Sequence, residues 1–262
     1  MWSRYVFFQN RPDAVLFILC PWPRTGSNLL LTYLNSLPGV GLRWEVLNHL
    51  EKHGIRSQYI GLQTVLRHLK ISVATSGPTV GGCKLMMDQL RHFGIGFDHL
   101  RELFPQARFV ILYRESLVGQ YISWQLGAKT GVWMVEKGES DAPSSHHQSL
   151  KIHFDIEHFQ SFAAEVRKRF SEIAADPWVA RQGVLIRYED LSREPDKVIR
   201  KTICPAIGLP QASMSTRLVK QNTRDPQQVI ENYGEVESFL RNASTDDSCQ
   251  LTPDYIQQLF ST

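Results

Sequence analysis

Residues 14–31, AVLFILCPWPRTGSNLLL, join an apolar strand, a short polar turn and the start of a helix. The strand cannot continue far beyond Cys20, because Pro21 and Pro23 cannot donate hydrogen bonds to a sheet. Apolar residues then return at helical spacing from Leu29 onward. A turn of this kind directs several backbone N–H groups and the positive end of a helix at one place, so it predicts a bound phosphate or sulfate.

The candidate anion ligands are the residues of this turn and of the helix start: Arg24, Thr25, Gly26, Ser27, Asn28 and Leu29. The turn is not a Walker A loop, because the pattern GxxxxGK[ST] is absent and no lysine lies in it. The same pattern also fits an ordinary strand–helix connection in which Ser27 only caps the helix. This segment alone leaves both interpretations open.

Strands and helices alternate along the rest of the chain. Apolar, β-rich runs lie at residues 15–19, 80–86, 108–113 and 183–188. Helical patterns lie at residues 27–37, 58–68, 96–103, 117–127, 157–173, 194–203 and 227–240. The alternation predicts an α/β fold, a three-layer parallel sheet with helices on both faces. We predict one domain over residues 1–262, with a lid or specificity loop at about 129–148, where a polar stretch shows no period.

The composition excludes some classes of partner. The chain has 262 residues, of which 42% are hydrophobic and 21% charged, and its net charge is +3. This charge is too small to indicate binding of nucleic acid, but it suits an anionic ligand in one local cleft. The four cysteines are widely spaced, which predicts reduced thiols in a cytoplasmic protein. No run reaches the ~18 apolar residues of a transmembrane segment. Homo-oligomer formation stays open.

A second candidate site follows the strand at residues 108–113. Arg114 stands directly after this strand, at the carboxyl end where open α/β sheets bind their ligands. Ser123 lies nine residues further on, in the predicted helix. An arginine and a hydroxyl in these places could hold a second phosphate, although a surface ion pair and an exposed serine explain them as well.

Together the two segments resemble the cofactor-binding motifs of sulfotransferases. PRTGSNLL (residues 23–30) is similar to the 5′-phosphosulfate loop of that superfamily, and YRESLVGQYISWQLG (113–127) to its 3′-phosphate motif. The segments IRYEDLS (186–192) and GLP (208–210) add to the likeness. Among the branches, the chain resembles the bacterial trehalose 2-sulfotransferase-like group most closely. CKLMMDQL (83–90) and the stretch KQN…VIENYGEV (220–236) are similar to segments of other bacterial sulfotransferases as well.

This resemblance implies a P-loop-like fold and a reaction. The co-substrate would be 3′-phosphoadenosine 5′-phosphosulfate (PAPS), and the acceptor a hydroxyl of a small molecule, a carbohydrate or a glycolipid. Arg24 and its turn would hold the 5′-phosphosulfate, Arg114 and Ser123 the 3′-phosphate, and Tyr188 would lie near the adenine. Three further residues would close over the 3′-phosphate: Lys220, Gln221 and Arg224. The in-line transfer is a matter of positioning and electrostatics, and no metal is expected.

The sequence offers more than one candidate for the general base. The eukaryotic cytosolic branch uses the histidine of a KxH strand end, but Met86 stands at that position here and cannot accept a proton. In the trehalose-type group the proposed base is a glutamate 21 residues after the loop arginine, which corresponds to Glu45. A helix would also align Glu45 with His49 and His53, as a solvated face or a poor metal site. The base therefore stays open between Glu45 and a nearby histidine.

Two other functions remain compatible with the sequence. One is a kinase-like phosphotransferase that uses ATP and Mg²⁺, although the missing GK[ST] disfavours it. The other is a non-catalytic nucleotide-binding protein on the same fold.

Overall fold

The structure is a computed structural model, and it describes residues 12–50, 54–55, 60–137, 150–209, 212–218, 224–243 and 249–260. The chain forms two compact units. Unit 1 consists of Met1–Tyr113 and Ile173–Thr216, and unit 2 of Arg114–Glu172 and Arg217–Thr262.

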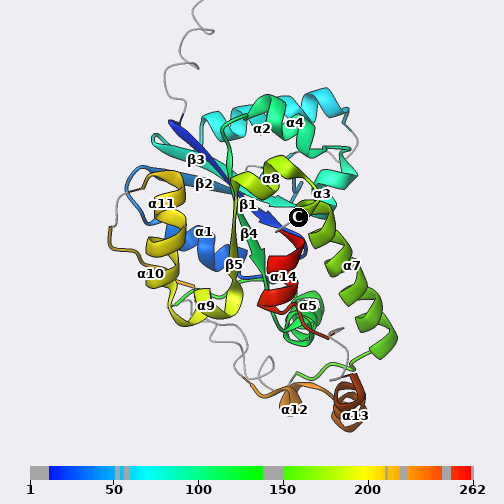
Figure 1. Cartoon of the computed structure of the whole chain (residues 1–262). Coiled ribbons are helices and arrows are strands. Elements are labelled where there is room, and N and C mark those ends of the chain that lie inside the picture. Colours follow the sequence, from blue (N-terminus) through cyan, green and yellow to red (C-terminus); the bar gives the residue numbers. More distant parts are fainter. Residues whose placement is uncertain are drawn as a thin grey trace, which may run out of the picture. The chain divides into compact units, whose positions relative to one another are not determined.

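Unit 1 contains a five-stranded sheet in the order β2-β3-β1-β4-β5, and every neighbouring pair is parallel. The strands are β1 (Ala14–Cys20), β2 (Val40–Glu45), β3 (Val80–Met86), β4 (Arg108–Tyr113) and β5 (Gly183–Arg187). Since all strands run the same way, their carboxyl ends meet at one edge of the sheet (Figure 1).

The sequence predicted four of these strands. The bounds of β3 and β4 are those expected. β1 is one residue longer than expected at each end, and β5 ends one residue earlier than expected. The edge strand β2 was not predicted. The helix considered for Glu45 and the histidines that follow it is wrong, because Glu45 ends a strand and turns follow it up to residue 50.

Helices cover both faces of this sheet. Figure 1 shows α1, α10 and α11 on one face and α2, α4 and α8 on the other. The bounds are α1 (Ser27–Asn35), α2 (Leu62–Ala74), α3 (Met87–His92), α4 (Phe97–Leu103), α8 (Pro177–Gln182), α9 (Tyr188–Arg193), α10 (Pro195–Val198), the π-helical η2 (Ile199–Ile203) and α11 (Cys204–Ile207). The expected three-layer α/β fold is confirmed.

Each face of the sheet has its own hydrophobic core. On the side of α1, Leu16 and Ile18 of β1 are fully buried against Leu30 and Leu34. On the other side, Phe17 packs edge-on against Phe104 at 5.3 Å between ring centroids, and Phe109 packs edge-on against Trp178 at 5.0 Å. Alternate residues of β1 thus serve opposite cores, which explains its unbroken apolar run.

Unit 2 is mainly helical. Its elements are α5 (Leu117–Thr130), most of α7 (Ile156–Ala174), α12 (Pro226–Val229), α13 (Tyr233–Ala243) and α14 (Pro253–Leu259). The fully buried Tyr121 is the centre of an aromatic cluster, with the rings of Phe154, Phe159 and Phe162 at 4.9–5.5 Å.

Some helix bounds differ from those predicted. The pattern at 194–203 forms α10 followed by η2, and the pattern at 227–240 forms α12 and α13. Helix α5 continues to Thr130, so the predicted loop at 129–148 begins later, and its residues 138–148 lie outside the described residues.

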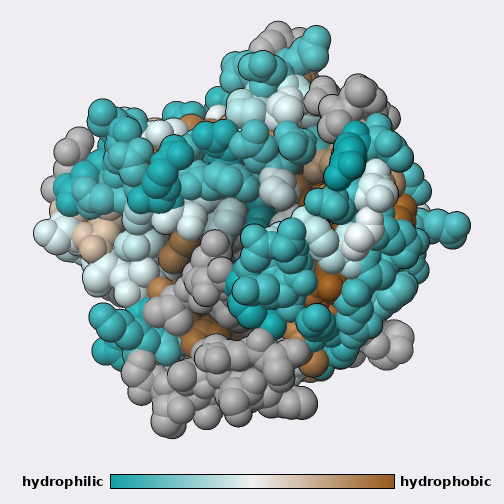
Figure 2. All heavy atoms as spheres, turned by 90° about the horizontal axis from the view of Figure 1, so that it is seen from below, coloured by the Kyte–Doolittle hydropathy of each residue, from teal (hydrophilic) through white to brown (hydrophobic). Residues whose placement is uncertain are grey.

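The surface of the described residues is mostly hydrophilic on the face that Figure 2 shows, with small hydrophobic areas between the polar ones. Among the described helices, none has the length and apolar character that crossing a membrane requires.

Candidate functional site

The turn after β1 has an unusual backbone. Arg24 has a φ of 69°, and it is the non-glycine residue with positive φ in the described part of the chain. Gly26, two residues later, has a φ of 84°. The left-handed region costs an L-residue on the order of 1 kcal/mol, and such strain gathers at functional sites. Arg24 is therefore held in its place by the surrounding structure.

The amino end of α1 has the features of an anion site. Gly26 is the N-cap and Ser27 is already helical, so the interpretation of Ser27 as a simple cap is wrong. No side chain among the described residues caps this helix, and its first turn has no acidic residue. Among the described residues, none accepts a hydrogen bond from the backbone N–H groups of residues 25–29. Consecutive unpaired N–H groups at a helix start form an anion site.

Tyr188, the first residue of α9, packs on this turn. A Cβ atom on Gly26 would lie 2.5 Å from Cδ2 of the tyrosine ring. Position 26 therefore requires glycine for two reasons. Its φ is positive, and the ring of Tyr188 fills the space that a side chain would need.

Glu45 lies at the same carboxyl edge, at the end of β2. The pairing of β2 with β3 has a bulge, because Arg43 pairs with Cys83 while Glu45 pairs with the next residue, Lys84. Trp44 is the additional residue. A bulge of this kind redirects side chains near active sites.

The carboxylate of Glu45 makes contacts with both oxygens. Nζ of Lys84 lies 2.7 Å from Oε1. Oε2 accepts hydrogen bonds from Nε2 of Gln89 at 2.7 Å and from Nδ2 of Asn48 at 3.1 Å. Lys84 also donates to Oδ1 of Asn28 at 2.6 Å, so Glu45 is connected to the turn after β1 through one lysine.

These contacts set the charge of Glu45. Burial alone raises the pKa of the carboxyl group, but the charge of Lys84 and the hydrogen bonds from Lys84, Gln89 and Asn48 outweigh it, and the pKa lies below the ordinary value of 4.5. Glu45 is therefore ionised at neutral pH and can accept a proton. Met86, at the position of the histidine in the KxH strand end, is buried in the core.

The second motif lies in unit 2. Arg114 is half-buried, and Ser123 lies in α5. The guanidinium of Arg114 lies over the first turn of α5, because a Cβ atom on Gly119 would be 2.9 Å from its Nη2. Ser116 caps the same helix by accepting a hydrogen bond from the N–H of Gly119 at 3.0 Å.

The predicted site residues are divided between the two units. The turn residues 24–29, Tyr188 and Glu45 belong to unit 1, whereas Arg114, Ser123 and Arg224 belong to unit 2. Arg224 donates to the backbone oxygen of Leu150 at 3.0 Å. Lys220, Gln221 and His53 lie outside the described residues.

Three residues around Glu45 were not predicted as site residues: Asn48, Lys84 and Gln89. A signal for Lys84 existed, because it is the one charged residue in an apolar strand. Gln89 lies in the segment 83–90 quoted for the resemblance, but neither amide was given a role. His49 is exposed in the turn after β2, and the described residues contain no group of three or more side chains suited to a metal ion.

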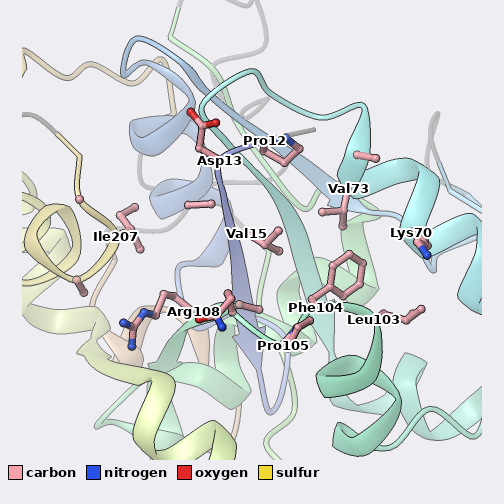
Figure 3. Close-up of a pocket in the computed structure, with 16 residues that line it drawn as sticks. Pro12, Asp13, Val15, Lys70, Val73, Leu103, Phe104, Pro105, Arg108 and Ile207 are labelled. Carbon is pink, nitrogen blue, oxygen red and sulfur yellow. The ribbon is translucent and has the colours of Figure 1, made fainter. Parts of the chain in front are cut away.

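A pocket of about 480 Å³ lies elsewhere in unit 1. Figure 3 shows its lining, which includes Val15, Val73, Phe104 and Arg108. Ala14, Val15 and Arg108 stand at the amino ends of β1 and β4, so this pocket occupies the edge of the sheet opposite to the turn and Glu45. Ligands of open α/β sheets bind at the carboxyl edge, and the pocket is therefore not the candidate site.

Comparisons with known proteins identify a sulfotransferase family. Residues 76–235 match the sequence profile described as Stf0 sulphotransferase. These residues include Lys84, Arg114, Ser123 and Tyr188, whereas the turn after β1 and Glu45 precede them. A comparison with curated protein sequences finds no match.

Similar solved structures are also sulfotransferases. A sulfotransferase from Alicyclobacillus acidocaldarius is 16% identical, with 88% of this chain and 92% of that chain covered and a TM-score of 0.49. A mouse sulfotransferase complexed with PAP is 12% identical, with 96% and 90% covered and a TM-score of 0.49. The sulfotransferase domain of the Synechococcus PCC 7002 olefin synthase is 18% identical, with 97% and 95% covered and a TM-score of 0.46.

Proposed function

Since the matched residues make up more than half of its length, the chain belongs to the Stf0 sulphotransferase family, and we propose that it transfers a sulfuryl group from PAPS to a hydroxyl. The acceptor would be a small molecule, a carbohydrate or a glycolipid. Membership of a sulfotransferase family agrees with the resemblance in the sequence, and it favours sulfuryl transfer over the phosphotransferase alternative.

The observation that supports a PAPS site most strongly is the turn after β1. Five consecutive residues, 25–29, have backbone N–H groups without an acceptor among the described residues, and they lie at the amino end of α1. A phosphosulfate supplies several anionic oxygens to such a site. The donor set therefore fits the 5′ end of PAPS, and it does so without a Walker A lysine.

The proposed roles of the remaining residues follow from this placement of the donor. Arg24 would donate two hydrogen bonds to the 5′-phosphosulfate and stabilise the charge that develops on the leaving phosphate. Arg114 and Ser123 would bind the 3′-phosphate, and Tyr188 would lie near the adenine. Lys220, Gln221 and Arg224 would close over the 3′-phosphate.

The reaction is an in-line displacement at sulfur. The acceptor oxygen forms a bond to sulfur, and the bond between sulfur and the 5′-phosphate oxygen breaks. The electron pair of that bond leaves with the phosphate, which gives adenosine 3′,5′-bisphosphate (PAP). Glu45, ionised by its surroundings, would take the proton of the acceptor hydroxyl.

We also propose a reducing, cytoplasmic setting. All four cysteines lie among the described residues and none forms a disulfide, and Cys20, Cys83 and Cys204 are buried. Unpaired cysteines are typical of a reducing compartment. No metal cofactor enters the proposed mechanism, since Arg24 and the N–H groups of the turn would stabilise the leaving charge.

The experiment that tests the proposal combines binding and transfer. The chain should bind PAP in calorimetry at micromolar concentrations, and it should transfer label from sulfur-35 PAPS to a compound in pools of sugars, glycolipids or phenols. Binding without transfer to any pool would favour the non-catalytic alternative. No binding of PAP far above micromolar concentrations would refute the proposal.

A further inference from the structure

Lys84 is unusual because of where it lies. It belongs to β3, whose seven residues are all buried, and Lys84 itself is 4% exposed. Lysine is almost never buried to this degree unless its charge is paired. The partners of this ammonium group therefore indicate why the strand contains it.

The partners come from two other elements. Nζ of Lys84 lies 2.7 Å from Oε1 of Glu45 at the end of β2 and 2.6 Å from Oδ1 of Asn28 in the first turn of α1. It also lies 5.7 Å from the ring centroid of Trp44. One ammonium group thus joins the helix start that would bind the donor to the carboxylate that would act as base.

The contact with Lys84 determines what Asn28 can do. A lysine only donates hydrogen bonds, so the amide oxygen of Asn28 must face it. The amide nitrogen of Asn28 is then the group left to interact with a ligand, and it can only donate. At a helix start with unpaired N–H groups, this orientation adds donors for an anion.

The same contact determines the state of Glu45. The groups that face the carboxylate are Lys84 from β3, Gln89 from α3 and Asn48 from the turn after β2. The charges of Lys84 and Glu45 also act on the thiol of Cys20 in β1. Burial raises the pKa of this thiol to about 11, so it stays neutral. Lys84 is therefore the charged group that holds Glu45 ionised.

We propose that Lys84 is a positioning residue of the sulfuryl-transfer site, which turns the amide of Asn28 toward the donor and holds Glu45 as an oriented carboxylate. This inference rests on the proposed function for its catalytic consequence. Its structural part, the control of Glu45 and Asn28 by one lysine, does not depend on any activity.

The first experiment follows the carboxyl group of Glu45 by NMR in protein labelled with ¹³C-glutamate, with Glu45→Gln to assign the signal. The pKa of Glu45 should rise in Lys84→Met, because the charge that lowers it is removed. It should stay near the wild-type value in Lys84→Arg, and in the control Lys197→Met, which removes an exposed lysine paired with Glu194. An unchanged pKa in folded Lys84→Met would overturn the inference.

The second experiment tests Asn28, and it stays informative if Lys84→Met does not fold. Asn28→Asp keeps an oxygen for Lys84 but replaces the donor amide with a second oxygen. Its affinity for PAP should fall by about tenfold or more and below that of Asn28→Ala, because an acceptor then faces the anion. Affinity of Asn28→Asp equal to that of the wild type would show that the amide nitrogen does not face the donor.

The third experiment measures kcat and kcat/KM against pH for sulfuryl transfer. In Lys84→Met the acidic limb of kcat/KM should move to higher pH together with the pKa of Glu45, and kcat should fall by about a hundredfold. Lys84→Arg should keep an acidic limb near that of the wild type and recover part of kcat. A wild-type acidic limb and turnover in Lys84→Met would overturn the inference, whereas absence of transfer in the wild type would instead refute the proposed function.

Discussion

Substitutions of Arg24 should change stability and turnover differently. Its φ of 69° is unfavourable for an arginine, and glycine relieves this strain while alanine does not. We expect Arg24→Gly to be about 1 kcal/mol more stable than Arg24→Ala in chemical denaturation. Both variants should lose turnover by similar factors, because both lack the guanidinium. Equal stability of the two variants would contradict a strained native turn.

Gly119 provides a test of the second phosphate site that leaves Arg114 in the chain. An alanine Cβ at this position would be 2.9 Å from Nη2 of Arg114 and 3.0 Å from Oγ of Ser116. The flexible end of the arginine can move away, so Gly119→Ala should fold with near wild-type stability but displace the guanidinium.

Calorimetry should then show weaker binding of PAP by Gly119→Ala, with the affinity for adenosine 5′-phosphosulfate little changed, since only PAP has a 3′-phosphate. Arg114→Ala should show the same selectivity with a larger loss, about 2–4 kcal/mol. An equal loss for both nucleotides would show that Arg114 does not bind the 3′-phosphate.

Glu45 is the residue on which the proposed chemistry depends. Glu45→Gln keeps the size and polarity of the side chain but cannot accept a proton. We expect kcat to fall by ~10²–10⁴-fold while the affinity for PAP stays within about twofold. Near-normal turnover in this variant, together with loss of turnover in His49→Ala or His53→Ala, would move the base to that histidine.

Among the helices and strands, the amino end of α1 should show the largest change in hydrogen exchange when a ligand binds. The N–H groups of residues 25–29 have no acceptor among the described residues, so their hydrogens should exchange with solvent faster than those inside α1. Saturating PAP should slow their exchange, and adenosine, which lacks phosphate, should not. Unchanged exchange in the presence of bound PAP would place the anion elsewhere.

The elements also show how far the sequence alone could lead. The strands β1, β3 and β4 were predicted because burial on both faces makes their sequences mostly apolar. The edge strand β2, VGLRWE, is short and only half-buried, and it contains a glycine and an arginine, so no periodicity identified it. Its contacts with Lys84 and Gln89 are long-range, and spacing along a chain cannot reveal them.

For the molecule as a whole, the reactivity of the cysteines is a measure of the packing of both units. Cys20, Cys83 and Cys204 of unit 1 are buried, whereas Cys249 of unit 2 is half-buried. We expect one thiol to react with a disulfide reagent in the native protein and four after denaturation. Cys249→Ser should remove the native reaction. Rapid reaction of all four thiols under native conditions would contradict the packing of unit 1.

The bulge in β2 makes this site sensitive to insertions and deletions. Consecutive residues of a regular strand face opposite sides, so Lys84 could contact only one of two neighbours. The bulge places both Trp44 and Glu45 beside it, an indole 5.7 Å from its ammonium and a carboxylate at 2.7 Å. A relative whose strand is one residue shorter must give up one of the two. A relative therefore keeps this site only if it keeps the length of the strand as well as the identity of its residues.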